Sequence, residues 1–164
     1  LKIEKDDVVA ALTVLRLAAR FEFRRDLSSS RSVIFDVAHN PDAMQQLAIL
    51  LKRYKALEKG GGRIAAVLAV MADKDVRGMI TALESCVDIW YIAQVDQARS
   101  MAAHEVAQTL KDVGKITDPE SIVEFATVES AYSAACEQTV AGDTVLVTGS
   151  FFTVAAVYEL SEQV

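Results

Sequence analysis

Three apolar segments of this chain are each followed by polar side chains that could take part in chemistry. Asp36 and His39 follow the first segment, Lys74 follows the second, and Ser150 follows the third. A carboxylate can accept hydrogen bonds from ribose hydroxyls, and a serine beside the free N–H groups of a helix start can hold a carboxylate. These residue types are therefore compatible with the binding of a ribose and of a carboxylate.

Each of these residues also has a purely structural interpretation. Asp36 could cap a turn at the end of its strand, His39 could be a solvated or packed side chain, and Ser150 could be an ordinary N-cap. The pair Asn40-Pro41 is adequately explained as a helix start, because proline suits the first helical position. Position along the chain leaves both interpretations open for Asp36, His39 and Ser150.

Several kinds of site are excluded because their motifs are missing. The chain has no GxxxxGK[ST] and no GxGxxG, and the glycines at 60–62 precede a strand, so it does not supply a main phosphate cradle. Residues 148–152 lack the flanking glycines of a nucleophile elbow, and His104 begins a helix, which excludes a serine hydrolase. Cys86 and Cys136 have no metal-type spacing, so we expect two ordinary thiols and no metal site on this chain.

Alternating strand and helix patterns position these residues. Period-two or continuously apolar runs predict strands over residues 21–24, 32–37, 64–70, 89–93, 122–126 and 144–148. Helical spacing predicts helices over 6–17, from 41 to the glycines at 60–62, and over 75–87, 102–113, 129–138 and 152–160. The serines at 28–30 predict a turn that joins the first two strands as an antiparallel hairpin.

Near-continuous apolar strands that alternate with amphipathic helices indicate an α/β fold. The pattern predicts a mostly parallel, Rossmann-like sheet with helices on both faces and the first strand antiparallel at an edge. No linker divides residues 1–164, so we expect one domain. Ligands in such sheets bind at the carboxyl ends of the strands, which selects residues 36–40, 71–75 and 148–150.

Composition narrows the class of partner. Of the 164 residues, 52% are hydrophobic and 24% are charged, and 17 basic against 23 acidic residues give a formal net charge of -6. This acidic balance argues against duplex nucleic acid as a partner. No apolar run is as long as a membrane span, which needs about 18 residues. No signal peptide is visible, so the cytoplasm is the expected compartment. The chain begins with Leu1, and we interpret it as a piece of a longer protein.

Three motifs together resemble the C-terminal domain of the Mur ligase superfamily. They are the DVAHNP segment at 36–41, the ADKD segment at 72–75 and the TGSFFTVA segment at 148–155. The first motif is shared across the superfamily. Its combination with the other two resembles the folate branch, the dihydrofolate synthase/folylpolyglutamate synthases.

The resemblance implies an amide ligase. In that family ATP phosphorylates a substrate carboxylate, and the amine of L-glutamate attacks the acyl phosphate of dihydropteroate or a folate. Arg20 and Asp36 match residues that bind ATP, His39 and Ser150 match residues that hold glutamate, and Lys74 lies at the same rim. The phosphate loop and the ligands of Mg²⁺ belong to a central domain of the same chain, so the isolated fragment is expected to be inactive.

One departure and two alternatives accompany this resemblance. The family usually has Pro-Gly before the arginine, whereas this chain has Ala18-Ala19, and alanine lacks the backbone freedom of glycine. A cell-wall Mur peptide ligase is one alternative. The other is a non-catalytic nucleotide-binding module with the same fold. A GxxGKGS-type loop upstream of Leu1 would distinguish a ligase from such a module.

Overall fold

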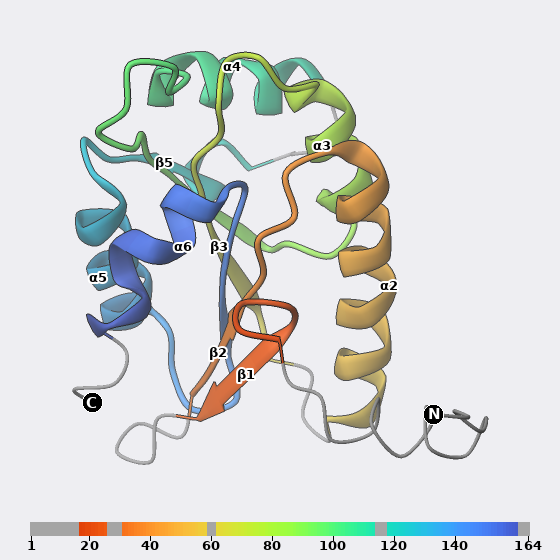
Figure 1. Ribbon diagram of the computed structural model, residues 1–164. Coiled ribbons are helices and arrows are strands. Elements are labelled where there is room, and N and C mark those ends of the chain that lie inside the picture. Colours follow the sequence, from red (N-terminus) through yellow and green to blue (C-terminus); the bar gives the residue numbers. More distant parts are fainter. Residues whose placement is uncertain (1–16, 26–30, 59–61, 114–117, 161–164) are drawn as a thin grey trace, which may run out of the picture.

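The computed structural model describes residues 17–25, 31–58, 62–113 and 118–160 (Figure 1). Strands and helices alternate there in the predicted order. The elements are β1 (Glu22–Arg25), β2 (Ser32–Phe35), α2 (Pro41–Leu57), β3 (Ile64–Leu68), α3 (Val76–Leu83), β4 (Ile89–Ile92), α4 (Ala103–Val113), η1 (Pro119–Ser121), β5 (Ile122–Glu124), α5 (Val128–Gln138), β6 (Thr144–Thr148) and α6 (Phe151–Tyr158). The helix expected from residue 6 and the turn at 28–30 lie outside the described residues.

The strands form one six-stranded sheet in the order β1-β2-β6-β3-β4-β5. Only the β1–β2 pair is antiparallel in the described sheet, and every other neighbouring pair is parallel. The predicted fold class, with its antiparallel edge strand, is confirmed. The last strand of the chain, β6, lies between β2 and β3, so three segments that are distant in sequence end side by side.

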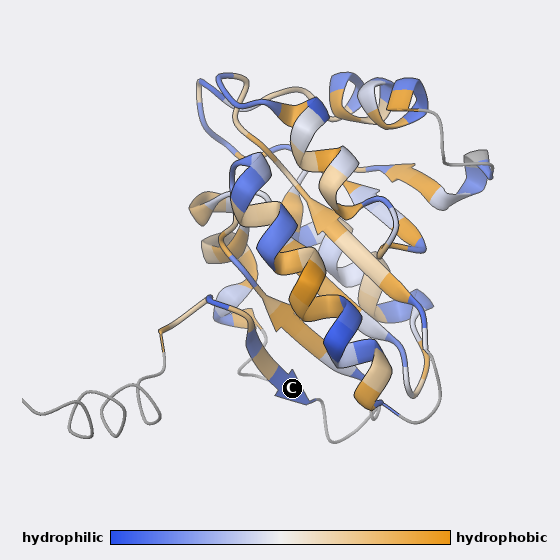
Figure 2. Ribbon diagram, turned by 90° about the vertical axis from the view of Figure 1, so that its right-hand side faces the viewer, coloured by the Kyte–Doolittle hydropathy of each residue, from blue (hydrophilic) through white to orange (hydrophobic). Residues whose placement is uncertain are grey.

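Helices cover both faces of the sheet. Helices α2, α3 and α4 pack on one face, and α5 and α6 pack on the other (Figure 1). Alternation along the central strands supplies both cores: Ile34 faces the first, whereas Val33 and Phe35 face the second. Every residue of β2, β3 and β6 is buried, as expected of strands covered on both sides. Figure 2 shows these hydrophobic strands behind helices of mixed hydropathy.

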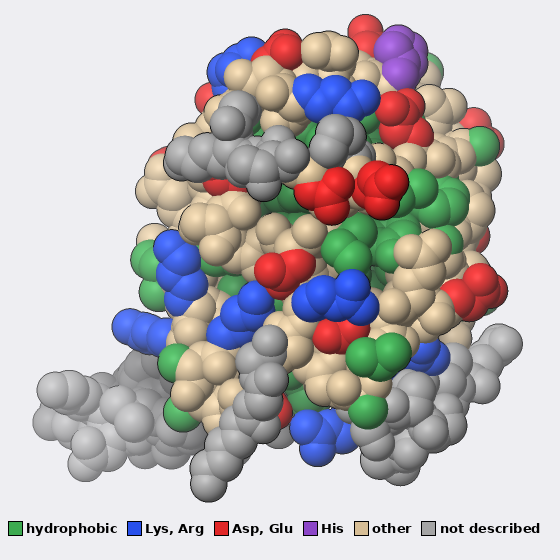
Figure 3. Space-filling view, turned by 180° about the vertical axis from the view of Figure 1, so that it is seen from behind, with side chains coloured by type: hydrophobic (Ala, Val, Ile, Leu, Met, Phe, Trp, Pro, Cys, Tyr) green, Lys and Arg blue, Asp and Glu red, His purple; other side chains and the backbone are tan. Residues whose placement is uncertain are grey.

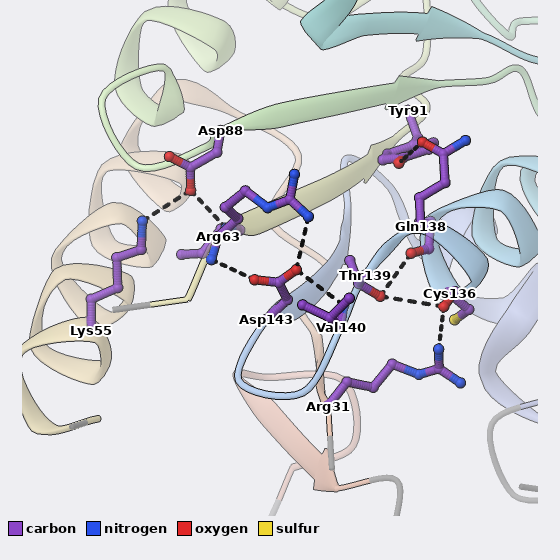
Figure 4. A network of polar contacts seen from close by, with 12 residues as sticks. Arg31, Lys55, Arg63, Asp88, Tyr91, Cys136, Gln138, Thr139, Val140 and Asp143 are labelled. Atoms are coloured by element: carbon purple, nitrogen blue, oxygen red, sulfur yellow. Dashed lines mark hydrogen bonds and ion pairs between the residues drawn. The ribbon is translucent and has the colours of Figure 1, made fainter. Parts of the chain in front are cut away.

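Polar side chains close the amino-terminal edge of the sheet (Figure 4). The carboxylate of Asp143 accepts hydrogen bonds from the backbone N–H of Arg63 at 2.8 Å, from its guanidinium at 3.1 Å and from the N–H of Val140 at 3.1 Å. Burial raises the pKa of Asp143, but these donors outweigh burial and lower it overall. Asp88 likewise accepts from Lys55 at 3.0 Å. Because these groups satisfy one another, we assign this edge a structural role.

The described surface is mixed in charge. On the face seen in Figure 3, Lys and Arg side chains are interspersed with Asp and Glu, and they form no continuous basic surface there. Within the described ranges, no helix combines the length and the hydropathy that crossing a membrane requires.

Candidate functional site

The carboxyl ends of β2, β6 and β3 are neighbours in the sheet, and a helix begins shortly after each. The side chains of Asn40, Asp75 and Ser150 cap these helices: each accepts a hydrogen bond from the backbone N–H three residues further on, at 2.9, 2.9 and 3.0 Å. The positive ends of three helix dipoles therefore lie along one edge, where they attract anions. The three segments selected from the sequence do meet.

Asp36 anchors the segment that carries Arg20. One carboxylate oxygen accepts from the N–H of Phe21 and the other from the N–H of Ala38, both at 2.8 Å. The side chain is buried, because these two backbone donors hold it against the chain. Burial raises its pKa, although both N–H donors and the charge of Arg20 act in the opposite direction. The turn-capping interpretation is confirmed, and a ribose contact stays a prediction.

Arg20 and His39 both contact the aromatic ring of Phe151. The guanidinium carbon of Arg20 is 5.8 Å from the ring centroid of Phe151, and the His39 ring is also 5.8 Å from it, tilted by 46°. The Nδ1 atom of His39 lies 2.9 Å from the carbonyl oxygen of Val37. Because a carbonyl only accepts, Nδ1 carries the proton, and in the neutral ring Nε2 is an acceptor. The structure thus brings Arg20, His39 and the start of α6 together.

The Ser150 hydroxyl is buried and fully engaged. It accepts from the N–H of Thr153 at 3.0 Å and lies 2.6 Å from the Thr153 hydroxyl. That hydroxyl donates to the carbonyl of Ala69 at 2.7 Å, so its oxygen must accept the proton of Ser150. Ser150 is therefore an N-cap in this structure. Because Ser150 accepts only from the N–H of Thr153, the first N–H groups of α6 can still donate to an anion. A direct contact between Ser150 and glutamate stays a prediction.

The described residues do not form a metal site. Within these ranges, no three side chains of His, Cys, Asp and Glu gather closely enough to hold a metal ion. Cys86 is buried and Cys136 is partly buried, and neither forms a disulfide among the described residues.

The family model for the Mur ligase, glutamate ligase domain, matches residues 19–151. This match begins at the segment that carries Arg20 and ends at the first residue of α6. The chain belongs to this family. The resemblance drawn from the three motifs is therefore confirmed at the level of the superfamily.

Several of the proteins most similar to this chain in sequence and structure are named as dihydrofolate synthase/folylpolyglutamate synthases, the folate branch of the superfamily. The dihydrofolate synthase/folylpolyglutamate synthase of Escherichia coli is 40% identical over 156 residues, 95% of this chain and 32% of that protein. E. coli FolC in complex with DHPP and ADP has a TM-score of 0.80 at 36% identity, over 99% of this chain and 36% of that chain. A bifunctional folylpolyglutamate synthase/dihydrofolate synthase with Mn, AMPPNP and L-glutamate bound has a TM-score of 0.81 at 30% identity, with the same two coverages. The chain spans about a third of the length of these relatives.

Lys74 lies at the rim of the glutamate ligase domain's carboxyl edge. Its ammonium is 3.3 Å from the carboxylate of Asp73, and this hydrogen bond lowers the pKa of Asp73. The next residue caps α3, whose first turn touches the start of α2: a Cβ on Gly78 would lie only 2.8 Å from Cγ of Pro41. Lys74 therefore lies beside the start of α3, which touches the start of α2, and it is already paired with Asp73, so a ligand contact stays a prediction.

Ala19, which stands where the family usually has glycine, adopts a backbone conformation that suits glycine better than alanine. Its φ is 55°, in the left-handed region that glycine adopts without strain. Ala19→Gly should therefore leave the free energy of unfolding within about 0.5 kcal/mol of wild type, because relief of about 1–2 kcal/mol offsets the lost methyl group and the added chain entropy. Chemical denaturation of the purified chain measures this.

Ala38 offers the matched control, because it is also buried and its φ is not positive. Ala38→Gly should lower the free energy of unfolding by about 1.5 kcal/mol, since no strain is relieved. Equal losses in the two variants would show that Ala19 carries no strain.

Two residues at this edge were not among the sequence-based site predictions. Gly149 has a φ of 113°, and a Cβ there would lie 2.4 Å from the carbonyl oxygen of Ala69. A glycine between a strand and a capping serine was the available signal for this close approach. Phe151 contacts both Arg20 and His39, and no sequence signal separates such an aromatic from a core residue.

Proposed function

We propose that this chain is the single, C-terminal domain of a longer cytoplasmic ligase that joins L-glutamate to dihydropteroate, to folates or to both at the expense of ATP. Membership in the glutamate ligase family and the names of its relatives support the reaction class. One structural observation carries the assignment: Arg20, His39 and the start of α6 gather around one ring at the carboxyl edge. A cation and helix N–H groups there suit phosphate and carboxylate ligands.

The proposed reaction has two steps. A carboxylate oxygen of dihydropteroate or folate attacks the γ-phosphorus of ATP, the bond to the β-phosphate oxygen breaks, and ADP leaves. The amine nitrogen of glutamate then attacks the acyl carbon, phosphate leaves, and the nitrogen loses a proton to form the amide. Both steps depend mainly on positioning and on stabilisation of charge.

Arg20 and Asp36 are the proposed ATP residues. Arg20 is exposed and carries a permanent charge, so it can donate to phosphate oxygens. Each carboxylate oxygen of Asp36 accepts one hydrogen bond from a backbone N–H, that of Phe21 or that of Ala38. A carboxylate has about four acceptor sites, so two are left for the ribose hydroxyls.

His39 and the start of α6 are the proposed glutamate site. In its neutral form, Nε2 of His39 can accept a hydrogen bond from the ammonium or amine of glutamate. The N–H groups at the start of α6, which Ser150 caps, can hold a carboxylate. Lys74 is proposed as a contact at the rim, where it would exchange its pairing with Asp73 for the ligand.

The phosphate loop and the metal ligands are assigned to a central domain of the same polypeptide. The chain has no phosphate-loop motif, and the described residues have no group that could hold a metal. When bound, Mg²⁺ would neutralise charge on the ATP phosphates. The family relatives' greater length supports an additional domain.

Steady-state kinetics of the full-length ligase test this proposal. The assay follows ADP release that depends on both L-glutamate and dihydropteroate. Arg20→Ala should raise the KM for ATP about ten- to a hundredfold, because a charged hydrogen bond of about 1.5–3 kcal/mol is lost. His39→Ala should raise the KM for glutamate more than that for ATP. Residues 1–164 alone should show no ligation.

Arg53→Ala is the matched charge control, because Arg53 is exposed in the second half of α2. Its Michaelis constants should equal those of wild type. Ligation by the isolated residues 1–164 would contradict the division of the site between two domains. A full-length protein that hydrolyses or binds ATP without joining glutamate to either acceptor would contradict the reaction.

A further inference from the structure

Phe151 is exposed although it is a large apolar residue. It is the first residue of α6, and 56% of its surface is accessible. The next residue, Phe152, is 45% exposed in the same turn. The two side chains border different hollows: Phe151 lines one of about 370 Å³ with Ala19 and Val37, and Phe152 lines one of about 660 Å³ with residues that follow β4 and β5. Only Phe151 therefore belongs to the side where Arg20 lies.

The ring of Phe151 contacts two groups that come from separate parts of the chain. The guanidinium of Arg20 approaches its face at 5.8 Å, within the range of a cation–π contact. The ring of His39 approaches at 5.8 Å and 46°, within the range of favourable aromatic pairs. Among the described residues, the Arg20 guanidinium therefore has this ring as a direct side-chain contact, and its charge also acts on Asp36.

We infer that Phe151 is a positioning residue, which holds Arg20 for the phosphates of ATP and His39 for glutamate through one shared ring. The inference rests on the proposed function for the identity of the two ligands. A long arginine side chain loses much rotational freedom when it binds a phosphate. A ring that already restricts the guanidinium removes part of that loss, and it does the same for the imidazole. Phe151 follows the Ser150 cap directly, so a rigid helix start sets the position of the ring.

Kinetics of the full-length ligase with single and double variants test this role. Phe151→Ala should raise the KM for ATP and the KM for glutamate about three- to tenfold each, with kcat changed less, because ground-state binding is lost. Phe151→Tyr should keep both KM values near those of wild type, because tyrosine retains the ring. Phe151→Leu should raise them as Phe151→Ala does, because leucine has no ring face. Phe152→Ala is the matched control and should leave both constants within about twofold.

Double variants show which contact carries each effect. After Arg20→Ala, Phe151→Ala should no longer raise the KM for ATP but should still raise the KM for glutamate. After His39→Ala, the pattern should reverse. Additive effects in both backgrounds would overturn the inference, because Phe151 would then act independently of these two residues.

A measurement without catalysis separates this inference from the proposed reaction. The ring protons of His39, assigned by their loss in His39→Gln, should shift in the NMR spectrum of Phe151→Ala and stay in place in Phe152→Ala. Unchanged KM values in an active Phe151→Ala enzyme would overturn the positioning role and leave the proposed reaction standing. A wild-type protein without ligase activity, in which the His39 protons still respond as expected, would overturn only the reaction.

Discussion

Replacing Gly149 with alanine is expected to lower the free energy of unfolding by about 3–5 kcal/mol. The φ of 113° is a conformation that L side chains rarely adopt, and the new Cβ would lie 2.4 Å from the carbonyl oxygen of Ala69 and 2.8 Å from a methyl of Leu68. The neighbour at 2.4 Å is backbone in the loop after β3, so it cannot rotate away. The end of β6 must therefore shift, and the cap of α6 with it. Chemical denaturation of residues 1–164 measures the loss.

The same change should affect the proposed ligase function. Ser150 and Phe151 follow Gly149 directly, so a displaced strand end moves the start of α6 away from His39. A displacement of about 1 Å at a reacting site can reduce the rate about a hundredfold. We expect a loss of that order in kcat/KM for the full-length enzyme at a temperature where the variant is still folded.

Gly142 offers a matched control for backbone strain without a clash. Its φ is 91°, and a Cβ there would meet nothing within 4 Å. Gly142→Ala should therefore cost only about 1–2 kcal/mol, the strain of a left-handed alanine. If the two variants lose equal stability, close approach to Ala69 is not what requires glycine at position 149.

Asp36→Ala is expected to weaken both the fold and the binding of ATP. The substitution leaves the N–H groups of Phe21 and Ala38 without their carboxylate acceptor, which should cost about 2–4 kcal/mol of stability. In the full-length ligase, the KM for ATP should rise about ten- to a hundredfold, because Asp36 holds the segment of Arg20 and is the proposed acceptor for the ribose hydroxyls. Denaturation and steady-state kinetics are measured on the same preparations.

Asp36→Asn tests the charge separately from the shape. Burial holds the pKa of Asp36 above its ordinary value of 3.8 in the folded protein. As pH rises past 3.8, the unfolded chain releases this proton first, so the contribution of Asp36 to stability falls until the folded pKa is passed. The stability of wild type relative to Asp36→Asn should decline over that interval and then level off. A relative stability that rises over the interval would show that the pKa is lowered.

For Asp36→Ala, an unchanged KM for ATP would show that Asp36 has a structural role alone.

Local chemistry made much of this fold predictable. Asn40 and Pro41 start α2 as expected, because one accepts from a free N–H and the other lacks an N–H that would need a partner. Ser150 caps α6 for a similar reason. Both effects act within three or four residues, so neither depends on the remainder of the chain. The alternation of buried strands with amphipathic helices likewise predicted the parallel sheet and its antiparallel edge strand.

Contacts between distant segments decided how the candidate site is arranged. The insertion of β6 between β2 and β3 brings residue 151 against residues 20 and 39, and no local pattern encodes that neighbour relation. The carboxylate of Asp36 is buried because the N–H of Phe21, fifteen positions earlier, reaches it.

The sequence by itself placed the starts of the described helices and strands that it predicted within one residue, and three motifs indicated which family the chain resembles. The tertiary structure alone decided that Asp36 points inward, that Ala19 adopts a positive φ and that Phe151 joins two candidate ligand groups. The physical reason is range: capping and hydropathy act between near neighbours in sequence, whereas the burial and partners of a side chain depend on which strands pack beside it.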